Sequence, residues 1–325
     1  SGETIASRIA SLIPKVKPEI VVAIAIEARQ KMHLRHVPLL IAREMARHPE
    51  HKKLVSALLP RVILRADELC EFVSIYWKDG KKPISAQAKK GLAKAFDRFN
   101  EYHLAKYNRD RDVKLRDVLR LCHPKPTTPD QGALWKRLNE GTLATPDTWE
   151  VALSAGKDKK ETWERLIAEG KLGALALLRN LRNMEKAGVT PKVVSMAIES
   201  ADCRRVLPFR FIAAARYSPN QEPSLEVAML KAVHESPKIP GITALVVDVS
   251  GSMDYKLSEK SEMTRLEAAS ALAILLRETC EEVRVFTFSN HVVAVPPRRG
   301  FALRDAIKNS QGHGGTYLGA ALTAV

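Results

Sequence analysis

Oxygen-bearing side chains that suit a metal ion follow a hydrophobic run in the last third of the chain. The run ALVV at residues 244–247 leads directly into Asp248, and Ser250 and Ser252 follow at alternate positions. Side chains alternate along an extended segment, so these three face the same side. One carboxylate and two hydroxyls are hard ligands that suit Mg²⁺ rather than zinc, with water completing an octahedron. The pattern predicts a divalent-cation site.

Two other roles for the same residues stay open. Asp248 and the serines can form a turn that caps the next helix. Ser250, between a strand and a helix, can also serve a hydrolase, but V-S-G-S lacks the G-x-S-x-G elbow and no His partner is apparent. The sequence has neither a paired-carboxylate nuclease pattern nor a phosphate-binding Walker motif. We therefore assign no catalytic residue and expect a protein that is not an enzyme.

Positive charge is concentrated in one part of the chain, whose net charge is +15 over 325 residues. Residues 238–325 carry ten Lys and Arg against nine Asp and Glu, so the first 237 residues hold +14 of that charge. Residues 78–125 alone carry fourteen Lys and Arg against six Asp and Glu, a net of +8. Such a field attracts polyanions, although a solvated surface that favours solubility has the same composition.

Aromatic side chains interleave with this positive charge. They are Tyr76, Trp77, Tyr102, Tyr107 and His123. Cations that neutralise phosphates and rings that stack on bases are thus available together, which favours RNA as the polyanion.

Helical periodicity dominates the first 237 residues. Apolar stripes at helical spacing recur at residues 19–33, 38–47, 54–65, 85–99, 148–154, 162–169, 172–187, 191–200 and 224–234. Prolines such as Pro18, Pro60 and Pro191 lie where these helices are expected to begin or end. Short connections favour antiparallel helix pairs, and stacked pairs form an α-solenoid of the HEAT kind. We predict an all-α helical-repeat domain over residues 1–237.

The pattern changes after residue 237, where a β-branched run typical of a buried parallel strand begins. A helix is expected at residues 264–280, a strand at 283–288, a short edge piece at 292–295 and a helix at 303–308. Strand, helix and strand in this order indicate a doubly wound, Rossmann-like α/β sheet. We predict that residues 238–325 form about half of such a domain, which makes the protein multidomain.

The cysteines and the lack of long apolar runs indicate the cellular compartment in which the protein is found. Cys70, Cys122, Cys203 and Cys280 are isolated, with no C-x-x-C pair. Such cysteines are usually small buried residues in a reducing setting. No run approaches the ~20 apolar residues that span a bilayer, and the N-terminus has no signal or transit pattern. We expect a cytoplasmic protein without a membrane segment.

The metal-ligand pattern resembles that of a known domain. D-x-S-x-S after a hydrophobic strand, followed later by G-G-T at residues 314–316, is similar to the metal-ion-dependent adhesion site of von Willebrand A domains. The resemblance implies that Thr316 supplies a third hydroxyl to Mg²⁺ or another divalent cation. It also implies a further Asp from a later strand, beyond Val325, so that the site is incomplete in this chain.

The helical part resembles the TROVE module of Ro autoantigen proteins, including bacterial-type Ro ribonucleoprotein orthologs. The resemblance rests on LAKY at residues 104–107, LRDVLRLCHPKP at 115–126, LALLRNLRNM at 175–184 and LPFRF at 207–211. It implies a ring of HEAT-like helices closed by the von Willebrand A domain. It further implies that Y-like noncoding RNA binds the basic outer face and that single-stranded 3′ ends of misfolded or structured RNA enter a central hole.

The resemblance also implies candidate RNA-binding residues. These are Lys106, Arg120, His123 and Lys125, with Lys81, Lys82, Lys89 and Lys90 extending the surface. His123, just before Pro124, can instead be a helix cap that complements the helix dipole.

We therefore predict a monomeric RNA-binding scaffold in RNA quality control, with an exoribonuclease as a further partner. The rival hypothesis is a protein–protein adhesion module in which a partner carboxylate completes the metal on Asp248, Ser250 and Ser252.

Overall fold

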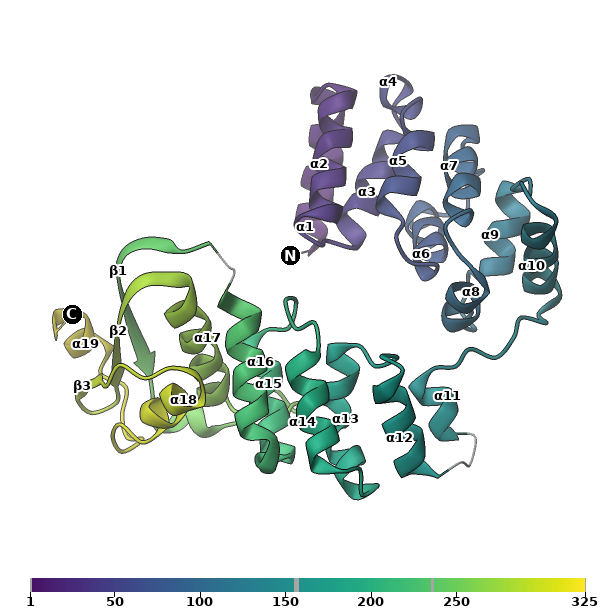
Figure 1. Ribbon diagram of the computed structural model, residues 1–325. Coiled ribbons are helices and arrows are strands. Elements are labelled where there is room, and N and C mark those ends of the chain that lie inside the picture. The colour runs from purple at the N-terminus through teal and green to yellow at the C-terminus, as the bar shows by residue number, and fades with distance from the viewer. Residues whose placement is uncertain (1, 155–157, 235–236, 325) are drawn as a thin grey trace. The chain divides into compact units, whose positions relative to one another are not determined.

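The fold consists of helices α1 to α19 and strands β1 to β3 in a computed structural model that describes residues 2–154, 158–234 and 237–324. By its packing the chain divides into two units, Ser1–Val151 and Ala152–Val325, and each is described by itself (Figure 1). The fold class expected from the sequence, a HEAT-like helical repeat followed by a partial α/β segment, is confirmed.

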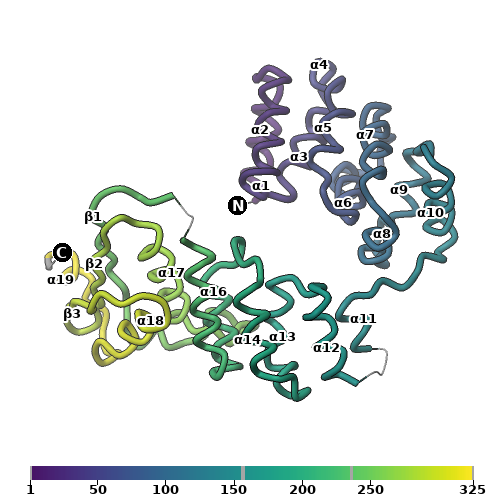
Figure 2. The backbone as a smooth tube through the Cα atoms, in the orientation of Figure 1, coloured from purple at the N-terminus to yellow at the C-terminus, as the bar shows by residue number. Residues whose placement is uncertain are grey.

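The first unit stacks its helices in two rows. It contains α1 (Gly2–Leu12), α2 (Pro18–Gln30), α3 (His36–Met45), α4 (Pro49–Lys52), α5 (Val55–Val62), α6 (Asp67–Tyr76), α7 (Ala86–Phe96), α8 (Glu101–Tyr107), α9 (Leu115–Cys122) and α10 (Pro129–Glu140). Helices α2, α5 and α7 pack side by side, as do α3, α6 and α9 in the second row (Figure 2). Contacts of α2 with α3 and of α7 with α9 join the rows, which is the layering of an α-solenoid.

Capping residues and one glycine explain how these helices begin and how closely they pack. Side chains of Ser85, Asn100 and Thr128 accept a hydrogen bond from the backbone N–H three residues later, at the starts of α7, α8 and α10. Gly91 lies where α7 meets α5, and a Cβ there would come within 2.9 Å of the Leu59 side chain. The packing of α7 against α5 therefore depends on the absence of a side chain at residue 91.

A network of charged residues fixes the start of α6. Glu68 is fully buried, and its Oε1 accepts a hydrogen bond of 2.6 Å from Arg29 Nη2. Its Oε2 accepts the backbone N–H groups of Leu64, at 2.7 Å, and Arg65, at 3.0 Å. One carboxylate therefore caps the helix and neutralises a buried guanidinium from α2.

The second unit has a two-row helical arrangement of its own. It contains α12 (Lys159–Ala168), α13 (Ala174–Lys186), α14 (Pro191–Ser200), α15 (Pro208–Tyr217) and α16 (Glu222–His234), while α11 (Trp149–Ser154) spans the division between the units. Helices α12, α14 and α16 lie in one row (Figure 1). Helices α13 and α15 lie in the other, followed by α17 (Arg265–Thr279).

A small mixed sheet completes the second unit. Strand β1 (Ile239–Asp248) pairs in parallel with β2 (Cys280–Phe288), and β2 pairs antiparallel with β3 (Val292–Val295). The parallel pair is joined through α17, the strand–helix–strand order expected from the sequence. Helices α18 (Gly300–Lys308) and α19 (Leu318–Ala324) follow. Asp248 is thereby placed at the carboxyl end of β1.

One of the predicted boundaries is wrong. Pro60 was expected at a helix end but lies inside α5, close to its last turn. A proline there lacks the backbone N–H that would otherwise donate to the carbonyl four residues earlier, that of Ser56. The functional division between residues 1–237 and 238–325 remains a prediction, since the packing itself divides the chain at Val151.

The cysteines are buried, as expected, and burial raises the pKa of Cys70 and Cys122 to about 12. Within the ranges that the structure describes, none of the helices is long and apolar enough to cross a membrane.

Candidate metal and nucleic-acid sites

The three predicted metal ligands of the D-x-S-x-S segment come together in one tight turn. The backbone N–H of Ser250 donates to Asp248 Oδ1 at 2.8 Å, and the hydroxyls of Ser250 and Ser252 lie 3.2 Å apart. Ser250 is buried, whereas Ser252 is exposed. Asp248 is thus bound to the turn that presents the two hydroxyls.

The loop that carries Thr316 lies against this turn. The backbone N–H of Gly251 donates to the carbonyl of Gly314 at 3.1 Å. Buried Ser289, directly after β2, accepts the Gly314 N–H at 2.8 Å and donates its hydroxyl to the Gly312 carbonyl at 2.9 Å. Thr316 is exposed two residues further on. The D-x-S-x-S and G-G-T segments are therefore neighbours in space.

A histidine–carboxylate pair links the same loop to the segment after the turn. His313 Nδ1 lies 2.8 Å from Asp254 Oδ1, and His313 Nε2 lies 3.0 Å from the Lys308 carbonyl. The hydrogen bond to Asp254 raises the pKa of His313 above its ordinary value of 6.5, while partial burial opposes the rise. Because the pair is 59 residues apart in sequence, it ties the G-G-T loop to the metal turn.

The oxygens fit a small hard cation. Ligands about 2.1 Å from Mg²⁺ in neighbouring octahedral positions are about 3.0 Å apart, close to the separation of the two serine hydroxyls. Groups of three or more His, Cys, Asp or Glu that could hold a metal are absent from the described residues, so a zinc-type cluster is not found there. The donor set of Asp248, Ser250, Ser252 and Thr316 suits Mg²⁺ chemistry instead.

The predicted RNA-binding lysines gather first around the start of α7. Lys81 and Lys82 are exposed in the loop before α7, where the Trp77 indole N–H donates to the Lys82 carbonyl at 2.8 Å. Lys81 Nζ lies 5.7 Å from the Trp77 ring centroid. Lys89 and Lys90 follow in the first turns of α7. We call Trp77 and these four lysines, which lie around the start of α7, the α7 group.

The end of α9 adjoins this group. His123 has φ 45° as the left-handed cap of α9, and its backbone N–H donates to the Leu119 carbonyl. Helix α9, which ends at Cys122, packs against α7, so His123 lies on a helix that adjoins the α7 group. Both His123 and Lys125 are exposed. The expected helix-cap role of His123 is therefore present in its backbone, while its ring stays accessible.

Lys106 belongs to a second group. Its Nζ lies 5.4 Å from the Tyr102 ring centroid and 5.9 Å from that of Tyr107, and the Arg65 guanidinium carbon lies 4.8 Å from the same Tyr107 ring. Arg65 precedes α6, whereas Lys81 follows it, and a ten-residue helix is about 15 Å long. The structure therefore separates Lys106 from the α7 group. We call the second set the Tyr107 group.

The contacts of Arg120 and Arg65 depend on tertiary packing and cannot be predicted from spacing along the sequence. Arg120 Nε donates to Asn139 Oδ1 at 2.7 Å, so α10 holds this side chain. Arg65 lies outside the basic segment of residues 78–125, and its place beside Tyr107 arises from tertiary packing. No sequence signal identified Arg65.

The lysines of these groups and His123 are exposed, apart from the half-buried Lys89. Among the described residues, no ion pair with a carboxylate is formed by Lys81, Lys82, Lys89, Lys90, Lys106, His123 or Lys125. Their charge therefore remains available to a polyanion.

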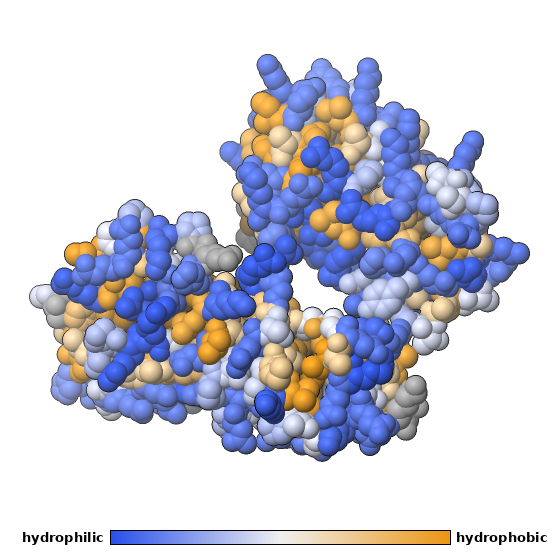
Figure 3. Space-filling model, viewed as in Figure 1, coloured by the Kyte–Doolittle hydropathy of each residue, from blue (hydrophilic) through white to orange (hydrophobic). Residues whose placement is uncertain are grey.

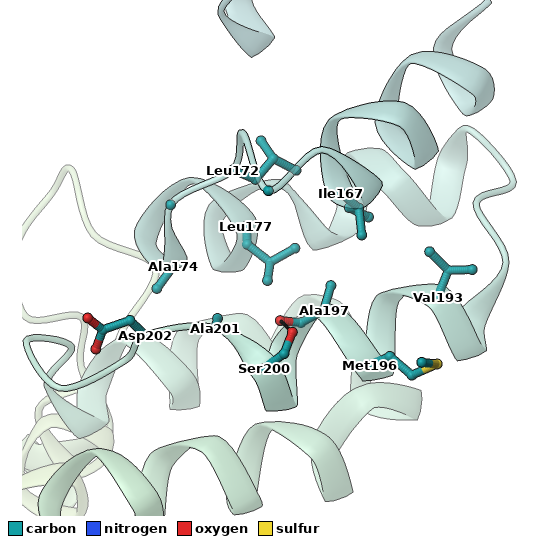
Figure 4. Close-up of a pocket in the computed structure, with 12 residues that line it drawn as sticks. Ile167, Leu172, Ala174, Leu177, Val193, Met196, Ala197, Ser200, Ala201 and Asp202 are labelled. Atoms are coloured by element: carbon teal, nitrogen blue, oxygen red, sulfur yellow. Dashed lines mark hydrogen bonds between the residues drawn. The ribbon is translucent and has the colours of Figure 1, made fainter.

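A separate hollow in the second unit is apolar. It has a volume of about 650 Å³ and lies between the end of α12, the start of α13 and α14, where hydrophobic residues gather in Figure 3. Ile167, Leu177 and Val193 line it (Figure 4). Asp202 lies at its edge, where Arg204 holds the pKa of the carboxyl far below its usual range.

Comparisons with known proteins identify the family. The TROVE domain model matches residues 1–142 and 132–236. Over 78 residues the chain is 37% identical to telomerase protein component 1 of Mus musculus and 36% identical to that of Rattus norvegicus; each match covers 22% of this chain. The chain spans about 3% of the length of these two relatives.

Among solved structures, the crystal structure of the RO (RSR) protein of Deinococcus radiodurans matches with a TM-score of 0.72 and 18% identity. The match covers 95% of this chain and 74% of that one, and it shows a common fold. The chain belongs to the TROVE-domain family, which confirms the resemblance seen in its four sequence motifs.

Proposed function

We propose that this protein binds a Y-like small noncoding RNA through the exposed cations of its first unit and acts in RNA quality control in the cytoplasm. The observation that carries the proposal is the set of lysines without acidic partners beside Trp77, Tyr102 and Tyr107. Lysines neutralise phosphates, and accessible rings stack on unpaired bases of a folded RNA. The α7 group and the Tyr107 group give such an RNA two separate points of attachment.

The wider role follows from the same proposal. Single-stranded 3′ ends of misfolded or structured RNA are the second class of ligand, held in the central hole that the family resemblance implies. An exoribonuclease is the partner that would consume them, and the protein itself acts as a monomeric, non-enzymatic scaffold.

The metal site serves a different purpose in this proposal. Asp248, Ser250, Ser252 and Thr316 hold a divalent cation, which supplies an electrophilic contact for an oxygen ligand of a partner. Ser252 and Thr316 are exposed, so a partner carboxylate can reach the cation. This exposure favours the second candidate function, metal-dependent protein adhesion, beside RNA binding.

One triple variant tests the RNA-binding surface. Lys106→Gln, His123→Asn and Lys125→Gln together remove two cations and a ring, and Asn tolerates the left-handed backbone of residue 123. The variant is expected to bind a labelled Y-like stem-loop at least tenfold more weakly in gel-shift titrations. The salt dependence of log K is expected to become shallower by about 1.5 to 2.

Lys52→Gln with Lys53→Gln, exposed around the end of α4, is the control with the same loss of charge. Equal weakening by both variants, or no weakening by the first, would refute the assignment of these residues.

A further inference from the structure

The second unit carries its own row of unpaired cations on α13. Arg179, Arg182 and Lys186 are exposed, and their spacing of three and four residues places them along one side of the helix. The opposite side is buried through Leu177, Leu181 and other apolar residues. Arg179 and Lys186 are about 10 Å apart along the axis. The row therefore presents three cations to solvent over roughly two helical turns.

Helix α15 extends this row with aromatic rings. It packs against α13, and the Arg182 guanidinium carbon lies 5.5 Å from the centroid of the Tyr217 ring. Arg210 is seven residues before Tyr217, on the same side of α15, and lies 5.0 Å from the Phe209 ring. Tyr217 is 41% exposed. The α13–α15 face, defined as Arg179, Arg182, Lys186, Phe209, Arg210 and Tyr217, thus combines four cations with two rings.

The charge of this face is not balanced from within. Among the residues that the structure describes, none of the four cations forms an ion pair with a carboxylate. The one acid on the exposed part of α13, Glu185, accepts the Ser218 hydroxyl at 3.4 Å. Arg216, by contrast, is held by Glu267 and the Glu262 carbonyl and does not belong to the face. Uncompensated cations repel one another, and a bound polyanion relieves that repulsion.

The neighbouring row of helices lacks this arrangement. On α14 and α16 the exposed lysines, Lys192 and Lys231, stand among acids such as Glu199 and Glu226. No cation–ring pair is found on these two helices among the described residues. The unpaired charge and the rings therefore lie together on one row, as a nucleic-acid surface requires and a merely solvated surface does not.

We propose that the α13–α15 face binds unpaired RNA. Arginine is planar and stacks on bases as well as pairing with phosphates, and the accessible Tyr217 ring offers a further stacking surface. Unpaired bases have free faces for such stacking, whereas the bases of a duplex are already stacked on each other. This inference deepens the proposed function and rests on it, since it names residues for the single-stranded ligand. These residues are separate from the stem-loop surface of the first unit.

The test compares two matched triple variants of the full chain. Arg179→Gln, Arg182→Gln and Arg210→Gln remove three cations from the face, and Lys192→Gln, Lys231→Gln and Lys238→Gln remove three exposed cations elsewhere in the same unit. The probes are a labelled oligouridine of about 12 nucleotides, within the range of single-strand site sizes, and a blunt-ended stem-loop. Thermal unfolding followed by circular dichroism confirms that each variant is folded.

The face variant is expected to bind oligouridine at least tenfold more weakly. The slope of log K against log salt concentration is expected to become shallower by about 2, because each phosphate contact with a single strand contributes about 0.7 to that slope. Its stem-loop affinity is expected to stay within twofold of the wild type, and the matched control to stay within threefold for both probes. Tyr217→Ala should weaken oligouridine binding about tenfold, and Tyr217→Phe should restore it.

The inference is overturned if the face variant keeps its oligouridine affinity, if the matched control loses as much, or if stem-loop binding is lost instead. The proposed stem-loop function is judged separately, by the variant of Lys106, His123 and Lys125. Failure of one proposal can therefore be distinguished from failure of the other.

Discussion

At the scale of single residues, a few side chains form hydrogen bonds with more than one neighbour. Glu68 shows this best, since one buried carboxylate binds Arg29 and two backbone N–H groups. Buried charges are tolerated when they are paired and fully hydrogen-bonded, and removal of one partner leaves the other uncompensated.

Glu68→Gln is therefore expected to destabilise the protein by about 3 kcal/mol, because Arg29 stays buried without its counter-ion. The unfolding temperature of the full chain, followed by circular dichroism, should fall by roughly 6 to 12 °C. Glu50→Gln, exposed on α4, is the control and should leave that temperature within about 1 °C of the wild type. Equal stability of both variants would show that the ion pair contributes nothing net.

The pair of His313 and Asp254 predicts a dependence of stability on pH. The raised pKa of His313 means that the folded state holds the proton more tightly than the unfolded state. The stabilisation is thus complete below the ordinary pKa of 6.5 and is lost as the pH rises through the raised value. Besides Asp254, the hydrogen bond to the Lys308 carbonyl raises the pKa of His313, while partial burial and the positive charge of Lys308 oppose the rise.

Asp254→Asn should therefore lower the unfolding temperature more at pH 6 than at pH 9, as measured by scanning fluorimetry. Asp112→Asn, an exposed carboxylate of the first unit, should show no such difference. A loss from Asp254→Asn that is the same at both pH values would contradict the role of the protonated histidine.

At the scale of elements, α18 is fixed to the helical repeat by a cap from another helix. Glu226 of α16 accepts the backbone N–H of Phe301 at 2.7 Å. Gly300 has φ +54°, and a Cβ there would lie 2.0 Å from Glu226 Oε1. Arg304 of α18 adds an ion pair to Glu222 of α16 at 3.2 Å. The α/β segment is thereby joined to α16 through charged contacts.

Gly300→Ala should break this junction, since the new methyl group displaces Glu226 and strains the left-handed backbone. We expect a loss of about 1 to 3 kcal/mol in the free energy of unfolding, measured by urea titration. Gly319→Ala, in α19 with open space around its Cα, is the control and should be neutral or slightly stabilising. An unchanged free energy of unfolding in Gly300→Ala would mean that Glu226 does not cap α18.

Several of the elements predicted from the sequence match the structure closely. The stripe at residues 191–200 coincides with α14, and the short piece at 292–295 coincides with β3. Helix α6 was missed because Asp67 and Glu68 occupy buried positions, which interrupts the apolar stripe. Burial of these acids depends on Arg29 of α2 and on Arg35, the residue before α3, and no local pattern contains that information.

The candidate sites likewise include one that the sequence predicted and others that depend on tertiary packing. Asp248, Ser250 and Ser252 are close in sequence, and the structure brings them together as expected. The RNA-binding candidates fall into two groups instead of one surface, and Arg65 joins Tyr107 from more than 40 residues away. Contacts over such separations depend on how the helices stack, which periodicity does not specify.

At the scale of the whole molecule, the metal site and the RNA-binding surfaces are expected to act independently. The metal ligands lie in residues 248–316, a segment with little net charge, whereas the α7 and Tyr107 groups belong to the first unit. Asp248→Asn, or chelation of divalent cations, should leave stem-loop affinity within twofold of the wild type in gel-shift titrations at constant ionic strength. If the proposed site binds Mg²⁺, Mg²⁺ is expected to raise the unfolding temperature of the wild type, and the same substitution is expected to abolish that rise.

The concentration of charge in residues 78–125 also governs how fast a complex forms. A local excess of +8 attracts an approaching polyanion before any side chain touches it, and dissolved ions shorten the reach of that attraction. Added salt should consequently slow capture far more than it hastens release. The exposed lysines thus first attract the approaching polyanion at a distance and then bind its phosphates.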